Sequence, residues 1–203
     1  EDDEAGEVLL EKTDSSGAAQ EEAVICIAPR LDLMNFLDSY ITGLENSADS
    51  LDVKFTLSEL LLQTAHLLHD AVGLNRVMYA SVVSDVGALQ TKFTAGSDRD
   101  ISFNLFTIDL SQDSIFKRQL KDNGSIWMTS AKWERLPELI PHSLGKMNPT
   151  HSFFSQALYV RGKPHGIFYA DRRVPQCELD HLAYQRFQEM VGKCQLLVNQ
   201  LLV

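Results

Sequence analysis

Apolar residues recur at helical spacing in two long segments of the chain. In the first, the apolar positions step by one, three or four residues and form one face: Leu57, Leu60, Leu61, Ala65, Leu68 and Val72. Thr56 and Glu59 have the spacing of a capping box, and Gly73 follows as a stop signal. In the second, similar steps continue to the end of the chain: Leu179, Ala183, Phe187, Met190, Cys194, Leu197 and Leu201. Both patterns predict amphipathic helices whose apolar stripes another element must cover.

A further helical pattern lies near the start of the chain. Pro29 is suited to open a helix, and a polar break at 46–50 ends the pattern. The apolar positions between them are Leu33, Leu37, Ile41 and Leu44. We therefore predict an N-terminal helix within residues 29–50.

The middle of the chain carries apolar runs typical of strands. Residues 76–84 and 88–96 are predicted to pair through a turn at 85–87. The stretch ALYVRGKPHGIFYADRR predicts a second hairpin, with strands at 156–161 and 165–170 and a turn at Gly162-Lys163. A brief apolar run, SIWMTS, begins at Ser125 and reads as a further strand.

The remaining segments give less regular patterns. Residues 101–110 fit a strand or a strand that leads into a loop, and Ser111 can cap a short helix through Leu120. Residues 131–150 contain three prolines and read as an irregular connection with one short helical turn. Consecutive hairpins between terminal helices predict an α+β fold, with an antiparallel sheet and the helices stacked on one face.

Charge changes the picture mainly at the start of the chain. Residues 1–22 hold nine acidic side chains against Lys12, so most of the net charge of −10 lies there. We interpret residues 1–28 as an acidic linker, because like charges repel and few apolar residues offset them. The rest of the chain has no basic excess, which argues against nucleic-acid binding. No apolar run approaches the roughly 18 residues of a membrane span.

Candidate catalytic and metal-binding residues are few. Cys26, Cys177 and Cys194 are scattered, without metal-ligand spacing, and favour a reducing, cytoplasmic location. His66 and His69 are three residues apart but have no third ligand nearby, and His142 and His151 lie in loop contexts, so we expect neither a metal nor a cofactor. Asp171-Arg172-Arg173 lacks a nucleophile or second carboxylate, and we interpret it as the polar boundary where a strand leaves the sheet.

Several of these segments resemble a known family. FFSQALYVRGKPHGIFYADRR resembles the last strand pair of a GAF domain, and LLLQTAHLLHDAVGLNRVMYASV is similar to its opening helix and first strand. DNGSIWMTSA resembles the segment before the variable pocket loop. GLNRVMYASV, NLF, LPELIP and RGKPHGIFYADR are further similar to the GAF-like region that follows an HDOD domain in bacterial signalling proteins. The resemblance implies one GAF-like domain over 29–203, with its core at 55–203.

The resemblance also implies a sheet of about six antiparallel strands and a small-molecule pocket on the face opposite the helices. NLFTIDL lacks the Lys and the final Glu of the cyclic-nucleotide signature, and no Cys is placed for a bilin or for methionine sulfoxide reduction. The residues expected around the pocket are Phe106, Trp127, Trp133, Leu136, His142, His151 and Phe153. Such a pocket can hold a ligand, or these side chains can fill it themselves.

Two functions follow as expectations. In the first, the chain is a non-catalytic regulatory module behind an HDOD or other signalling domain, and forms a homodimer through its helices. The residues expected at that dimer contact are Leu33, Leu37, Ile41, Leu44, Phe187, Met190, Leu197 and Leu201. In the second, it is a sensor of a metabolite or nucleotide, with an apolar aromatic pocket. A third option, an enzyme, lacks a recognisable catalytic set.

Overall fold

Six strands form a single antiparallel sheet in the order β3-β2-β1-β6-β5-β4. The structure, a computed structural model, describes residues 30, 56–97, 100–173 and 177–201. The strands are β1 (Arg76–Val83), β2 (Ala88–Ala95), β3 (Thr107–Asp109), β4 (Ser125–Met128), β5 (Phe153–Val160) and β6 (Lys163–Asp171). The predicted α+β class with an antiparallel sheet is confirmed.

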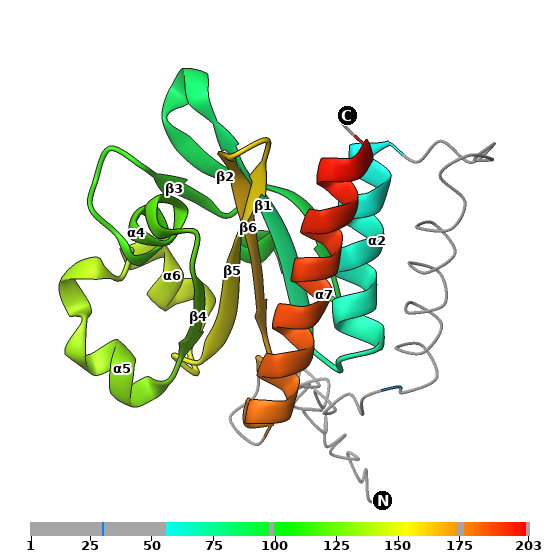
Figure 1. The fold of residues 1–203 in the computed structure, drawn as a ribbon. Coiled ribbons are helices and arrows are strands. Elements are labelled where there is room, and N and C mark those ends of the chain that lie inside the picture. Colours follow the sequence, from blue (N-terminus) through cyan, green and yellow to red (C-terminus); the bar gives the residue numbers. More distant parts are fainter. Residues whose placement is uncertain (1–29, 31–55, 98–99, 174–176, 202–203) are drawn as a thin grey trace, which may run out of the picture.

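Two long helices cover one face of the sheet. They are α2 (Leu57–Asp70) and α7 (His181–Leu201), and they lie side by side in Figure 1. The capping box is present as predicted, because the Thr56 hydroxyl accepts from the Glu59 N–H and the Glu59 carboxylate accepts from the Thr56 N–H. The predicted apolar stripes of both helices meet Tyr79, Phe154 and Phe168 of the sheet in one core.

Short helices and connecting segments cover the other face. They are α3 (Ile101–Asn104), α4 (Ile115–Asp122), α5 (Ser130–Arg135) and α6 (His142–Met147), with 3-10 turns η1 (Ser84–Val86) and η2 (Pro137–Leu139) in the connections. In Figure 1, α4, α5 and α6 lie on the side of the sheet opposite α7. Their apolar side chains form a second core with Met78, Phe153 and Tyr169.

This second side of the molecule corrects three predictions. Residues 101–104 are helical, since the Asp100 carboxylate caps them, and the strand begins only at Thr107. The short helix is capped by Ser114, because Ser111 is held in a turn by the Asp109 carboxylate. The connection at 131–150 contains α5, η2 and α6. A Pro can stand at or just before a first helical turn, so its prolines are compatible with short helices.

The β5–β6 hairpin is longer than predicted, and its turn is shifted by one residue. Arg161 and Gly162 form the turn with φ values of 51° and 73°, the left-handed pair of a two-residue hairpin loop. Gly166 lies opposite Leu158 and Ser81, and a Cβ there would stand 2.3 Å from the Ala80 carbonyl oxygen. The strand therefore needs Gly at this position.

Some predictions fall on other parts of the chain. The acidic linker at 1–28 and the helix with Leu33, Leu37, Ile41 and Leu44 lie outside the described residues, as does the side chain of Leu201. No helix of the described ranges is long and apolar enough to cross a membrane.

Candidate functional site

An aromatic core fills the face of the sheet that the short helices cover. Rings in contact link Phe106 to Phe116 (6.4 Å between centroids), Phe116 to Phe153 (5.9 Å) and Phe153 to Tyr169 (4.9 Å). Trp133 of α5 meets Phe153 edge-on at 6.3 Å. Of the residues expected around a pocket, Phe106, Trp133 and Phe153 are thus brought together as packed core.

The other expected pocket residues lie elsewhere. Trp127 is on the face under α2 and α7, because its register on β4 places it with Phe154 and Tyr184. His151 stacks on Trp133 at 4.4 Å, and Leu136 is 37% exposed. His142 lines a hollow of about 350 Å³ between α6 and β3, together with Asp109 and other residues. The structure therefore does not bring the expected residues together around one cavity.

The α7 stripe expected at a dimer contact is used inside the chain. Phe187, Met190 and Leu197 are buried in the core between α7, α2 and the sheet. Two other leucines of α7 face outward, Leu182 and Leu196, with 54% and 64% of their surface exposed. They are two heptads apart and so lie along one face of the helix.

A buried ion pair joins the ends of β1 and β6. Arg76 and Asp171 are direct cross-strand neighbours, and two hydrogen bonds connect them: Nε to Oδ1 at 2.9 Å and Nη2 to Oδ2 at 2.6 Å. Arg76 Nη1 also donates to Asp100 Oδ2 at 2.5 Å, and the guanidinium lies 4.7 Å from the centre of the Phe103 ring. Burial is the largest single influence and lowers the pKa of Arg76, but the charge and hydrogen bonds of Asp171 and the hydrogen bond to Asp100 together outweigh it, so the pKa is raised and the side chain stays charged.

This ion pair adds to the interpretation of Asp171-Arg172-Arg173, since β6 does end at Asp171, where the strand leaves the sheet. Asp171 is 0% exposed and pairs with the distant Arg76, and it also accepts from the Arg173 N–H at 3.0 Å. The sequence gives Arg76 no obvious role, although it stands two residues before Met78 and so shares the buried face of β1.

Hydrogen bonds extend from the ion pair toward the end of the sheet. The Tyr169 hydroxyl donates to Asp171 Oδ2 (2.8 Å), and Asn148 Nδ2 donates to the Tyr169 hydroxyl (2.7 Å). Burial is the main cause that raises the pKa of Tyr169, with Asp171 adding to it. The side-chain oxygen of Asn148, Oδ1, then accepts from the Thr150 hydroxyl at 2.8 Å. Thr150 in turn lines an open cleft.

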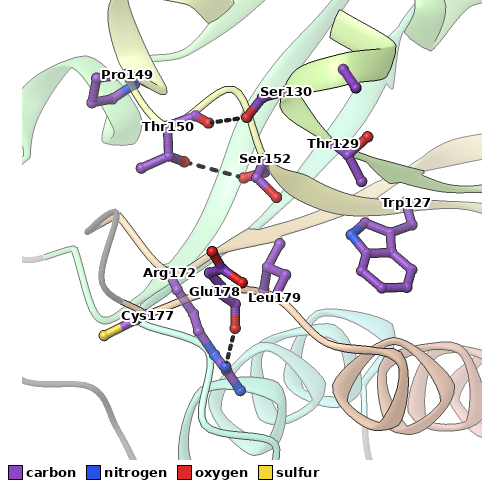
Figure 2. Close-up of a pocket in the computed structure, with 11 residues that line it drawn as sticks. Trp127, Thr129, Ser130, Pro149, Thr150, Ser152, Arg172, Cys177, Glu178 and Leu179 are labelled. Carbon is purple, nitrogen blue, oxygen red and sulfur yellow. Dashed lines mark hydrogen bonds between the residues drawn. The ribbon is translucent and has the colours of Figure 1, made fainter.

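That cleft lies where β4, the 149–152 segment and the segment before α7 meet (Figure 2). Its volume is about 510 Å³, within the range of small-molecule sites. The lining residues are Trp127, Thr129, Ser130, Ala131, Pro149, Thr150, Ser152, Arg172, Cys177, Glu178 and Leu179. Trp127 alone of these was expected at a ligand site, since the others come from segments whose meeting depends on the sheet register.

The described thiols do not offer a nucleophile. Cys194 is free but only 3% exposed, and burial raises its pKa to about 11. Cys177 is buried and disulfide-bonded. A disulfide is more typical of oxidising compartments, so the cytoplasmic location expected from the cysteines stays a prediction.

The histidines of the described ranges do not form a metal site. His69 Nδ1 is 2.6 Å from Asp70 Oδ1, next to it on α2. His66 is exposed on the same helix. Groups of three or more His, Cys, Asp or Glu side chains arranged to hold a metal ion are absent from the part of the chain that the structure describes.

Comparison with known proteins identifies the fold. No protein-family model and no curated protein matches the sequence. The structure is similar to the GAF domain of a phosphoenolpyruvate-protein phosphotransferase from Acinetobacter, with 12% identity, a TM-score of 0.58 and coverage of 84% of this chain and 92% of that domain.

Two further solved structures share the fold. A GAF domain/HD domain protein from Geobacter sulfurreducens has 13% identity and a TM-score of 0.57, over 72% of this chain and 94% of that one. The free methionine-R-sulfoxide reductase of Neisseria meningitidis, solved with its substrate, has 14% identity and a TM-score of 0.56, over 87% and 97%. The fold is therefore GAF-like, as the sequence resemblance implied.

Proposed function

We propose that this chain is a non-catalytic regulatory module of a bacterial, cytoplasmic signalling protein. It acts through contacts of its helices with a second copy or with a neighbouring domain, and an HDOD domain precedes it in the full-length protein. The observation that carries this proposal is the aromatic core on the face where the GAF resemblance implies a ligand. Because Phe106, Phe116 and Phe153 fill that face, signals are more readily passed through the outer surfaces of the domain.

The chemistry of the buried groups also favours a module without catalysis. The Arg76–Asp171 pair is enclosed and hydrogen-bonded on both sides, and Cys194 is a protonated, buried thiol at neutral pH. These groups hold the fold together, and none of them is placed to meet a substrate.

The HDOD part of the proposal rests on sequence resemblance, in GLNRVMYASV and LPELIP above all. One structure with the same fold is itself described as a GAF domain/HD domain protein. The sequence of the full-length gene product tests this part directly, since an HDOD domain ahead of Glu1 is expected there.

The outward face of α7 is the surface that we assign to dimerisation. Leu182 and Leu196 are exposed on it, with Glu189 and Lys193 paired at 2.8 Å between them. Burial of a leucine is worth about 1.5–3 kcal/mol, so two leucines per protomer would contribute substantially to the free energy of dimerisation.

Sedimentation velocity tests this surface. We expect the chain to dimerise, and Leu182→Glu/Leu196→Glu to weaken the dimer by at least tenfold, about 1.4 kcal/mol. Ile101→Glu/Leu105→Glu, which changes two exposed residues of the α3 turn, is the matched control and leaves the dimer intact. A monomer at all concentrations, or equal weakening by both pairs, contradicts helix-mediated dimerisation.

The open cleft beside Trp127 favours a second function, a small-molecule sensor. Its volume suits a metabolite, and hydrogen bonds link its wall at Thr150 to the buried Arg76–Asp171 pair. Ligand binding there would act on the position of a loop that the core holds in place.

A further inference from the structure

The cleft beside Trp127 presents hydrogen-bond acceptors. The Ser130 hydroxyl donates to the Thr150 carbonyl (3.2 Å), Thr150 donates to Asn148 Oδ1 (2.8 Å) and Ser152 donates to the Met128 carbonyl (3.2 Å). A hydroxyl has one proton and two lone pairs. With each proton committed to the protein, these three side chains offer the cleft acceptors only.

A carboxylate adds negative charge to the same space. Glu178 is exposed, and among the described residues its carboxylate has neither an ion pair nor a hydrogen bond. In Figure 2 this carboxylate points toward the side of the cleft that carries Ser152 and Thr150.

The cationic side chains near the cleft are engaged elsewhere. The Arg172 guanidinium points away from Ser152 in Figure 2 and donates to the Glu178 carbonyl at 2.5 Å. It also lies 3.5 Å from Asp180. Lys132 is not a lining residue, and its Nζ donates to the Trp127 carbonyl at 2.9 Å. The Glu178 carboxylate is therefore the charged group of the cleft that a ligand of opposite charge can neutralise.

Trp127 supplies one donor and an apolar wall. Its indole Nε1 is buried and finds no hydrogen-bond partner among the residues that the structure describes. Leaving a buried donor without a partner is unfavourable, so an acceptor that reached this N–H would stabilise the complex. The indole ring is also the aromatic surface that attracts cations most strongly.

We propose that this cleft binds a small organic ammonium compound that also carries a hydrogen-bond acceptor, such as an amino amide or amino alcohol. The ammonium group contacts the Glu178 carboxylate and the hydroxyl lone pairs of Thr150 and Ser152. The acceptor receives the indole N–H of Trp127, and the carbon skeleton rests on Trp127 and Leu179. This inference rests on the sensor function proposed above and names its ligand class.

The Trp127 indole N–H is a direct reporter of binding. The chain has two tryptophans, so a ¹⁵N-labelled sample gives two indole cross-peaks, and that of Trp133 in the other core is the internal control. The probe is glycinamide, titrated at slightly acidic pH so that its amine is protonated. We expect a saturable shift of the Trp127 peak alone. Acetamide, which lacks the charge, should bind at least tenfold more weakly.

Variants assign the charge recognition to Glu178. Glu178→Gln keeps the shape of an exposed side chain and should weaken glycinamide binding at least tenfold. Glu134→Gln, on the exposed side of α5 and outside the cleft lining, is the matched control and should bind as the unchanged chain does.

Three results overturn the proposal: an unmoved Trp127 peak, acetamide binding as tightly as glycinamide, or Glu178→Gln binding unchanged. Binding is measured on the 203-residue chain and needs no signalling output. A Trp127 peak that glycinamide leaves in place but an uncharged or anionic metabolite shifts would contradict the ligand class and keep the sensor function. The regulatory function is tested separately, by sedimentation and the full-length sequence.

Discussion

The two faces of the sheet bury polar groups in opposite ways. The face under α2 and α7 keeps its ionisable groups neutral, since burial raises the pKa of both Tyr79 and Cys194. The face under the short helices encloses a charged pair, Arg76 and Asp171, and supplies each charge with partners. Both faces bury these groups, but one keeps them uncharged and the other pairs opposite charges.

This difference explains how each face is specified. An apolar helix stripe packs on any sheet that offers an apolar surface. The face under α2 and α7 therefore needs only helices with the right spacing of apolar residues. A buried charge is tolerated only with its partner in place, so the other face demands one register of β1 against β6. The short helices then fit around a position that the ion pair has fixed.

The largest effect is expected from breaking the ion pair. Asp171→Ala leaves the Arg76 guanidinium buried with Asp100 as its remaining carboxylate, and we expect a loss of about 3–5 kcal/mol in the free energy of unfolding. Urea unfolding followed by circular dichroism measures it. Asp113→Ala, which removes an exposed pair with Arg118, is the control and should leave the midpoint unchanged. A midpoint for Asp171→Ala equal to that of the control would show that the pair does not hold the two strands.

The buried thiol on the face under α2 and α7 should make the free energy of unfolding fall at alkaline pH. The pKa of Cys194 is about 11 in the folded chain against an ordinary value of 9.0, so the unfolded chain loses this proton first. Its stabilising contribution is present below pH 9 and is lost as the pH rises toward 11, by roughly 2–3 kcal/mol. Tyr79 acts in the same direction above pH 10.

Cys194→Ala isolates the thiol from the other groups. The fall in unfolding free energy between pH 8 and pH 11 should be smaller in this variant, while the contribution of Tyr79 is the same in both chains. Equal falls in the two chains would mean that the thiol ionises as easily inside the fold as outside it.

The same contrast shows what the sequence could and could not predict. Local signals located α2, its Thr56–Glu59 cap and the stripe of α7, because each depends on residues within a few positions of one another. Arg76 and Asp171 are 95 residues apart, and only the strand register brings them together. The Trp127 cleft was missed for the same reason, since β4, the 149–152 segment and Glu178 meet through the sheet.

The predicted cap at Ser111 shows how local chemistry can also mislead. Ser111 precedes the helix, but its N–H and hydroxyl are both bound by Asp109, at 2.7 and 2.8 Å. Ser114 has the extended backbone of a cap and accepts from the Lys117 N–H at 3.2 Å. The competing Asp109 turn therefore decides which serine begins the helix.

The smallest effects are expected from substitutions at helix caps, one on each face of the sheet. Ser114→Ala leaves the Lys117 N–H without its partner at a position where Ser114 is 3% exposed, so we expect a loss near 2 kcal/mol, the upper end for caps. Thr56 is exposed and water can replace its hydroxyl, so Thr56→Ala should cost about 0.5–1 kcal/mol. Ser111→Ala, the control, should cost less than either. Urea unfolding measures the loss in unfolding free energy for each variant. A loss for Ser111→Ala as large as that for Ser114→Ala would show that Ser111 caps the helix.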